Sequence, residues 1–198
     1  MVVQKSPQMR RPFTSFAVLA VAATALCSGL IRCGHADVAL AAEPNREYAV
    51  KAAFIYNFAQ FTQWPAEAFP AADSPLTIGV IGDSNGPLET AVQQIAGKAV
   101  GTHAIAIKHV SGPGDAARCQ LLVVSPNADE QLDEIFKQVA DKPVLTVGES
   151  DKFPWAGGCI RFVTEDNKVR FEINPDAADR AHLRISSKLM KLARIFKR

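Results

Sequence analysis

Apolar and polar residues alternate in two short runs near the C-terminus, residues 160–164 and 169–173. A period of two is typical of a β-strand with one buried face, and the short connection between the runs predicts an antiparallel hairpin. A two-residue turn at Asp166-Asn167 fixes the register of the pairing. The expected pairs are Ile160 with Ile173, Arg161 with Glu172, and Phe162 with Phe171.

Upstream of the hairpin, apolar runs of strand length alternate with runs of helical periodicity. An aromatic-rich helix is expected over Arg46–Trp64, where Pro65 ends it. Further strands are expected over Leu76–Ile81, Ala104–Val110, Cys119–Ser125 and Pro143–Val147, with helices over Pro87–Ala96 and from Asn127 to Ala140. This order predicts an α/β fold, a single compact domain whose mainly parallel sheet is flanked by helices and completed by the antiparallel hairpin.

Two caps are expected after the hairpin. Asn174 followed by Pro175 predicts the start of a short helix. Ser186 or Ser187 can then cap a terminal helix. The apolar side of that helix would carry Leu189, Leu192, Ala193 and Phe196.

The first 41 residues have the layout of a secretory signal peptide. Basic residues precede an apolar run from Phe13 to Ile31, and small residues follow it. Cleavage after Ala41 or after Ala36 fits this layout, and Ala41 is preferred; the alternative is a retained membrane anchor. We therefore divide the chain into a signal peptide over residues 1–41 and an exported domain over residues 42–198.

Removal of the signal peptide changes the charge of the protein. The whole chain has a formal net charge of +2, whereas residues 42–198 hold 18 basic and 19 acidic residues, a net charge of −1. This balance argues against nucleic acid as a partner, because phosphate binding needs a concentrated positive surface. The stretch from Arg180 to Arg198 is an exception, since it is basic and contains no acid. Its helix could lie on an anionic membrane or an acidic patch of a partner, or simply pack on the sheet.

Residues 42–198 retain two cysteines, Cys119 and Cys159. In an oxidising compartment they could form a disulfide, and closing a loop of about 40 residues would stabilise the fold by a few kcal/mol. Two buried thiols on separate strands are the alternative. A zinc site is not supported, because neither cysteine belongs to a paired ligand motif and the three histidines of this region are scattered.

A catalytic motif is not evident in the sequence. The GESD tetrapeptide at residues 148–151 lacks the glycine that a nucleophile elbow places two residues after its serine. The two acids of that tetrapeptide, or Asp83 with Glu89, could form an acid/base pair, but solvated loop carboxylates are commoner. The turn Gly82–Gly86 before a helix could bind an anion, although it has no phosphate-binding motif. The sequence therefore predicts neither enzyme activity nor a metal or cofactor.

Several blocks of residues follow one another in a fixed order across residues 47–195. They are Lys51 to Phe58 with Trp64-Pro65, Gly82 after its strand, Cys119 before its strand, Leu145-Thr146-Val147, Phe153, Gly157-Gly158, Val169 to Asn174, Ser186 to Leu189, and Lys191 to Ala193. Together these collinear blocks resemble the YfiR family. The number of blocks makes the resemblance specific.

The resemblance implies a periplasmic regulatory domain that binds the periplasmic part of an inner-membrane diguanylate cyclase of the YfiN type. Binding would repress the cyclase and lower cyclic di-GMP, a regulator of biofilm formation, and an outer-membrane lipoprotein of the YfiB type would relieve the repression. The family supplies no catalytic residues. Similar domains are attached to sensor kinases. Some relatives carry additional cysteines in redox-sensitive bridges, which this chain lacks.

Aromatic and basic residues provide the candidates for partner binding, because such residues are enriched at the centres of interfaces. They are Asn57, Phe61, Trp64, Trp155, Lys188, Lys191 and Arg194. A homodimer stays open as a further assembly. The competing hypothesis is a periplasmic small-molecule sensor that uses the Gly82–Gly86 turn as its pocket and acts through another membrane partner such as a kinase.

Overall fold

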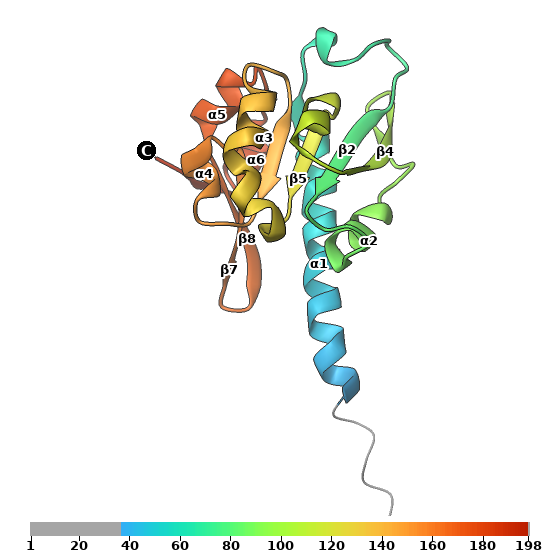
Figure 1. Cartoon of the computed structure of the whole chain (residues 1–198), viewed down its shortest axis with the longest axis vertical. Helices are drawn as coiled ribbons and strands as arrows, with labels where there is room; N and C mark the ends of the chain where they lie inside the picture. The colour runs from blue at the N-terminus through green and yellow to red at the C-terminus, as the bar shows by residue number, and fades with distance from the viewer. Residues whose placement is uncertain (1–36, 198) are drawn as a thin grey trace, which may run out of the picture. The chain divides into compact units, whose positions relative to one another are not determined.

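A computed structural model describes the backbone of residues 37–197 and the side chains of residues 45–197 (Figure 1). The helices are α1 (Asp37–Gln60), α2 (Pro87–Gln93), α3 (Leu132–Val139), α4 (Phe153–Ala156), α5 (Pro175–Arg180) and α6 (Ser187–Met190), with 3₁₀ turns η1 (Ala66–Ala68), η2 (Pro113–Arg118) and η3 (Pro126–Gln131). The strands are β1 (Thr62–Gln63), β2 (Leu76–Ile81), β3 (Ala99–Val100), β4 (His103–Val110), β5 (Leu121–Val124), β6 (Leu145–Gly148), β7 (Ile160–Glu165), β8 (Lys168–Ile173), β9 (Arg184–Ile185) and β10 (Arg194–Ile195). The predicted signal peptide falls largely outside the described residues and stays a prediction.

Eight strands form one mixed sheet in the order β10-β8-β7-β6-β5-β2-β4-β3. The central strands β4, β2, β5, β6 and β7 run parallel to one another, and β10 runs parallel to β8. Antiparallel pairing occurs between β7 and β8 and between β3 and β4, while β1 and β9 form a separate antiparallel pair. The predicted α/β fold with a mainly parallel sheet and an antiparallel hairpin is confirmed.

The β7–β8 hairpin has the predicted register. Ile160 pairs with Ile173, Arg161 with Glu172, and Phe162 with Phe171. Both turn residues have positive φ angles, 50° at Asp166 and 57° at Asn167. Such angles define the type I′ turn, whose twist matches that of the flanking strands, and Asp and Asn tolerate them better than most residues.

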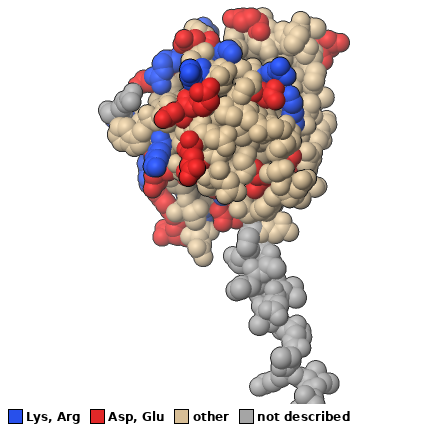
Figure 2. All heavy atoms as spheres, in the orientation of Figure 1, with Lys and Arg blue, Asp and Glu red and all other residues tan. Residues whose placement is uncertain are grey.

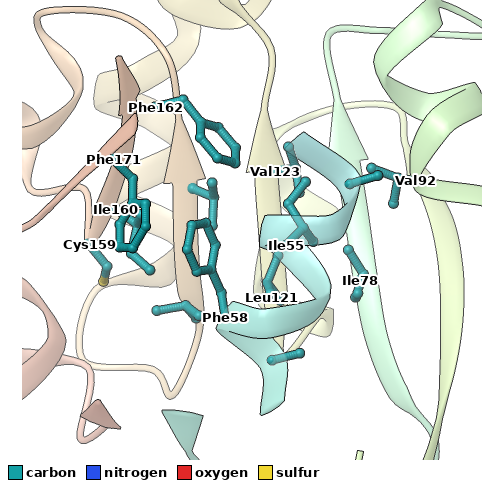
Figure 3. Close-up of a cluster of buried hydrophobic side chains, with 14 of the residues drawn as sticks. Ile55, Phe58, Ile78, Val92, Leu121, Val123, Cys159, Ile160, Phe162 and Phe171 are labelled. Atoms are coloured by element: carbon teal, nitrogen blue, oxygen red, sulfur yellow. The ribbon is translucent and has the colours of Figure 1, made fainter. Parts of the chain in front are cut away.

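Helices cover both faces of the sheet, and each face has its own core. Buried residues of α1, α2, α5 and α6 share one cluster with alternate residues of the strands, and buried residues of α3 and α4 belong to the other. Figure 3 shows Phe58 of α1 beside the hairpin residues Phe162 and Phe171. The ring centroids of Phe58 lie 5.6 Å and 5.0 Å from those of Phe162 and Phe171, so the hairpin is packed directly on α1.

The Gly157-Gly158 pair has a packing explanation. Gly157 has a φ of +114° and ends α4, a conformation that residues with a Cβ rarely adopt. A Cβ at Gly158 would lie 2.1 Å from the ring of Phe153, and one at Gly148 would lie 2.4 Å from the same ring. The buried Phe153 ring therefore fits between two glycines that begin and end the connection from β6 to β7.

Two predicted helices end earlier than expected, although the first also begins earlier, at Asp37 rather than Arg46. The first ends at Gln60 instead of Trp64, because residues 62–63 pair with Arg184–Ile185 of β9. The terminal helix ends at Met190, and residues 194–195 instead form the edge strand β10. In both places pairing with a distant strand outweighs a helical sequence pattern. Among the helices of residues 37–197, none combines the length and the apolar character that a bilayer crossing requires.

Candidate functional site

Charged side chains gather where α1, the connection from β6 to α4, the β7–β8 hairpin and β10 meet. Several of them line a cavity of about 320 Å³. We name this group the charged cluster, and its members are Glu47, Lys51, Glu149, Asp151, Arg161, Glu165, Glu172 and Arg194. Because its residues come from all four segments, the cluster ties the N-terminal helix and the C-terminal strand to the centre of the fold.

Lys51 is the most buried cation of the charged cluster, with a side chain that is 4% exposed. Its Nζ lies 2.7 Å from Glu149 Oε2 and 2.8 Å from Glu47 Oε1. Burial lowers the pKa of Lys51, but hydrogen bonds to Glu149 and Glu47, together with the charge attraction of these two carboxylates, more than offset this effect and leave the pKa raised. Lys51 is therefore held as a charged link between α1 and the end of β6.

Glu172 of β8 joins two arginines of the charged cluster. Arg161 Nη2 lies 2.9 Å from Glu172 Oε2, and Arg194 Nη1 lies 3.2 Å from Glu172 Oε1. Arg161 also pairs with Asp151, and Arg194 with Glu165. The predicted partner-binding residue Arg194 thus anchors β10 to the hairpin, which gives it a structural role inside the molecule.

The second carboxylate pair considered from the sequence, Asp83 with Glu89, also has structural partners. Asp83 Oδ2 accepts a hydrogen bond from the Glu89 backbone N–H at 2.8 Å. Glu89 Oε2 accepts one from the Asn85 backbone N–H at 3.1 Å and lies 3.2 Å from His109 Nδ1. The Asp83 carboxylate therefore already occupies the position at the start of α2 where the sequence allowed an external anion.

The first three predicted partner-binding residues lie at the aromatic end of α1, and they differ in exposure. Asn57 and Phe61 are exposed, Phe61 by 37%. Phe61 lies next to α6, since its carbonyl oxygen accepts a hydrogen bond from the Ser186 backbone N–H at 2.9 Å. Trp64 instead turns inward, and its Nε1–H donates to the carbonyl oxygen of Gln120 at 3.0 Å. Asn57 and Phe61 are accessible to a partner, whereas Trp64 helps to hold the start of β5.

The remaining predicted residues lie toward the C-terminus. Trp155 is 56% exposed on α4, and its ring lies edge-on to that of Phe196 with centroids 4.9 Å apart. Lys188 lies on α6 and Lys191 directly follows that helix, both exposed. The structure therefore brings Trp155 to the C-terminal segment, a proximity that no sequence pattern indicated.

Cys119 and Cys159 are free, buried thiols, so the disulfide that the sequence allowed is absent. Cys119 precedes β5 and Cys159 precedes β7, with β6 between the two strands. Two strand spacings amount to about 10 Å, which exceeds the Cα separation that a disulfide can span. Burial raises the pKa of the Cys119 thiol to about 11, and burial also raises the pKa of Cys159.

The described surface gives no sign of a metal site. Within residues 45–197, no three His, Cys, Asp or Glu side chains come together as a group that could hold a metal ion. Figure 2 shows acidic and basic side chains interspersed on the face in view, without a continuous basic area there. The acids and bases of the charged cluster are engaged with one another in ion pairs.

Comparison with known proteins identifies the family. Residues 48–194 match the model of the YfiR/HmsC-like family, which is most of the chain. The chain belongs to the YfiR/HmsC-like family. The resemblance read from the sequence blocks is confirmed.

Other comparisons add little to this YfiR/HmsC-like assignment. Among solved structures, the chain is similar to a conserved domain protein from Vibrio cholerae O1 biovar El Tor str. N16961, with 10% sequence identity and a TM-score of 0.45. That alignment covers 62% of this chain and 55% of the other, so this chain spans about half the length of that protein. Comparison with curated proteins gave no match.

Sequence reasoning found one pair in the charged cluster of this YfiR/HmsC-like domain, Arg161 with Glu172, and missed the contacts that join the other members. Lys51 and Glu149 are 98 positions apart, and no local pattern links them. For Lys51 the available signal was composition, since this lysine lies among apolar residues in a helix that is otherwise suited to burial. A buried lysine requires a carboxylate nearby, but the sequence does not say which one.

Proposed function

We propose that this YfiR/HmsC-like protein is a non-catalytic periplasmic regulator that binds and represses an inner-membrane diguanylate cyclase of the YfiN type. The family match over residues 48–194 carries this proposal. Binding to the periplasmic part of the cyclase lowers cyclic di-GMP in the cytoplasm. An outer-membrane lipoprotein of the YfiB type relieves the repression by sequestering the repressor.

The geometry supports a binding role and suggests where the cyclase docks. Phe61 presents an aromatic ring at the end of α1, and Asn57 lies one helical turn before it. Asn57 belongs to a helix anchored by the buried Ile55 and Phe58, and Phe61 directly follows that helix, its backbone N–H donating to the Asn57 carbonyl oxygen at 2.9 Å. The surface is therefore rigid and loses little entropy on binding. An exposed aromatic ring on such a support is a frequent anchor of protein interfaces.

The test is intracellular cyclic di-GMP in matched strains that lack or overproduce the protein. Deletion is expected to raise cyclic di-GMP and overproduction to lower it. Phe61→Glu is expected to behave like the deletion, whereas Thr90→Glu, an exposed position on α2, should repress normally. Equal cyclic di-GMP in all strains, with the protein present and folded, would reject the repressor function.

A small-molecule sensor is the second candidate, and one cavity favours it. A space of about 190 Å³ between α3 and α5 is lined by apolar residues, with Asp141 and Arg180 at the same site. The Gly82–Gly86 turn is not available for this role, because Asp83 already fills it. A rise in melting temperature with a periplasmic metabolite, abolished by Arg180→Ala, would favour the sensor.

A further inference from the structure

Exposed apolar side chains lie in the C-terminal segment and on α4, which contacts that segment through the rings of Trp155 and Phe196. Leu192 is 75% exposed, Trp155 is 56% exposed and Ile195 is 37% exposed. Phe196 joins them through its contact with Trp155. We name this surface the C-terminal edge, and it comprises Trp155, Lys188, Lys191, Leu192, Ile195, Phe196 and Lys197.

The neighbours of these residues are firmly held, so their exposure is built into the fold. Leu189 is buried in the core, and Met190 and Ala193 pack against it. Arg194 pairs with two carboxylates of the hairpin, and the Phe196 backbone N–H donates to the Ile173 carbonyl oxygen at 2.8 Å. Leu192 and Ile195 are thus presented to solvent from anchored backbone rather than from a loose chain end.

The C-terminal edge also carries positive charges that no neighbouring carboxylate within residues 45–197 neutralises. Lys188, Lys191 and Lys197 form no ion pair with any described residue. No acid occurs in the sequence from Arg180 to Arg198. The basic residue that is neutralised is Arg194, by Glu165 and Glu172. The edge therefore offers apolar side chains flanked by free cations.

This combination fits a lipid surface better than a protein. Protein interface centres are enriched in arginine and depleted in lysine, and a stable interface needs about 20–30 residues on each side. The C-terminal edge has lysines as its free cations and consists of a few residues. Long lysine side chains beside exposed Trp and Leu are typical of segments that lie at the bilayer interface, where the ammonium groups reach lipid phosphates.

We propose that the C-terminal edge binds the surface of an anionic phospholipid bilayer. Trp155 and Leu192 enter the headgroup region, and Lys188, Lys191 and Lys197 contact the phosphates. This binding does not depend on the repressor function. It would hold an exported domain close to the membrane in which a cyclase or kinase partner resides.

The first test is sedimentation with vesicles, using protein purified from the periplasm of a producing strain. Pelleting is expected with vesicles that contain phosphatidylglycerol and not with vesicles of phosphatidylcholine alone. The double variant Lys188→Gln with Lys191→Gln is expected to bind about 30-fold more weakly, and Leu192→Ser about tenfold more weakly. The matched control, Lys137→Gln with Lys142→Gln on the α3 side, should bind like the wild type.

Tryptophan fluorescence gives a second readout that depends on Trp155 alone. The protein has two tryptophans, so Trp64→Phe leaves Trp155 as the reporter. Its emission is expected to shift to the blue with phosphatidylglycerol vesicles. Absence of pelleting and of the shift would overturn the proposal, as would equal weakening by the control lysines. Binding only to vesicles that carry a reconstituted cyclase would also overturn it and assign the edge to a protein partner.

Discussion

Replacement of Lys51 by methionine tests whether the charged cluster stabilises the fold. Methionine keeps most of the length and apolar character of the lysine stem but has no charge. The change leaves Glu149, whose side chain is 20% exposed, and Glu47, which is 40% exposed, without their shared cation. Loss of the cation costs more free energy at Glu149 than at Glu47, because the Glu149 carboxylate is less exposed to water.

The expected loss of unfolding free energy is the sum of the contributions of the two ion pairs of Lys51. The Glu47 pair is an exposed contact within one helix, and such pairs contribute about 0.3–0.5 kcal/mol. The Glu149 pair is a charged hydrogen bond in partly buried surroundings, worth about 1.5–3 kcal/mol, and solvent at Glu149 reduces it toward the lower figure. We therefore expect Lys51→Met to lower the free energy of unfolding by about 2 kcal/mol, or the melting temperature by about 4–8 °C.

Urea denaturation of the wild type, Lys51→Met, Glu47→Gln, Glu149→Gln and the double variant Lys51→Met with Glu149→Gln measures these terms. Glu47→Gln should cost less than about 0.5 kcal/mol. The double variant should be less destabilised than the sum of its two single changes, because the charges are removed together. A loss below about 0.5 kcal/mol for Lys51→Met, or strict additivity, would refute the argument.

The pH dependence of the same variant gives an independent check. The pKa of Lys51 is raised above its ordinary value of 10.5 in the folded state, so the folded state holds this proton more tightly than the unfolded state. The contribution of Lys51 is therefore complete below pH 10.5 and is lost as the pH rises through the folded pKa. The stability difference between wild type and Lys51→Met should be constant at neutral pH and shrink only in strong alkali.

Three further changes test other parts of the fold. Asn174→Ala removes the cap of α5, where the Asn174 side chain accepts a backbone hydrogen bond at 3.2 Å, and should cost about 1–2 kcal/mol in urea denaturation. Asn174→Asp keeps the cap but loses the donor to the Pro154 carbonyl oxygen at a buried site, so it should recover only part of that loss. Trp64→Phe should cost about 1 kcal/mol, because the Gln120 carbonyl oxygen loses one of its two donors and keeps only the Leu145 backbone N–H; an unchanged midpoint would contradict this. Cys119 and Cys159 should resist a thiol reagent in the folded protein and react after denaturation, and intact mass showing a disulfide would contradict the structure.

The parts of the fold that could be predicted from the sequence are those determined by residues close together in the chain. The register of the hairpin follows from strict alternation and a two-residue turn, so every contact lies within about a dozen residues. The cap at Asn174 is likewise visible in the dipeptide Asn174-Pro175. The ends of α1 and α6 could not be predicted this way, because β1 and β10 exist only through partners far along the chain.

For the candidate partner-binding residues, too, the sequence indicates the residue type but not the tertiary surroundings. Composition selected Phe61, Trp64 and Trp155 alike as partner-binding candidates, but it could not separate the two exposed residues, Phe61 and Trp155, from Trp64, which turns inward. Arg194 was chosen for its charge, and its use within the charged cluster depends on Glu165 and Glu172 being folded next to it. Exposure and pairing are tertiary properties, so residue type alone ranks candidates without deciding among them.

The positions of the cysteines bear on redox regulation in this domain. A Cβ at Gly79 would lie 2.6 Å from Cys119 Sγ, so the thiol packs directly against the glycine backbone. Cys119 therefore acts as a small apolar side chain of the core. Cys159 is buried in the other core cluster, beyond β6. Joining the two sulfurs would require β6 to leave the sheet. The fold is thus complete without a disulfide, and redox sensitivity in relatives with more cysteines would come from those additional residues rather than from the shared framework.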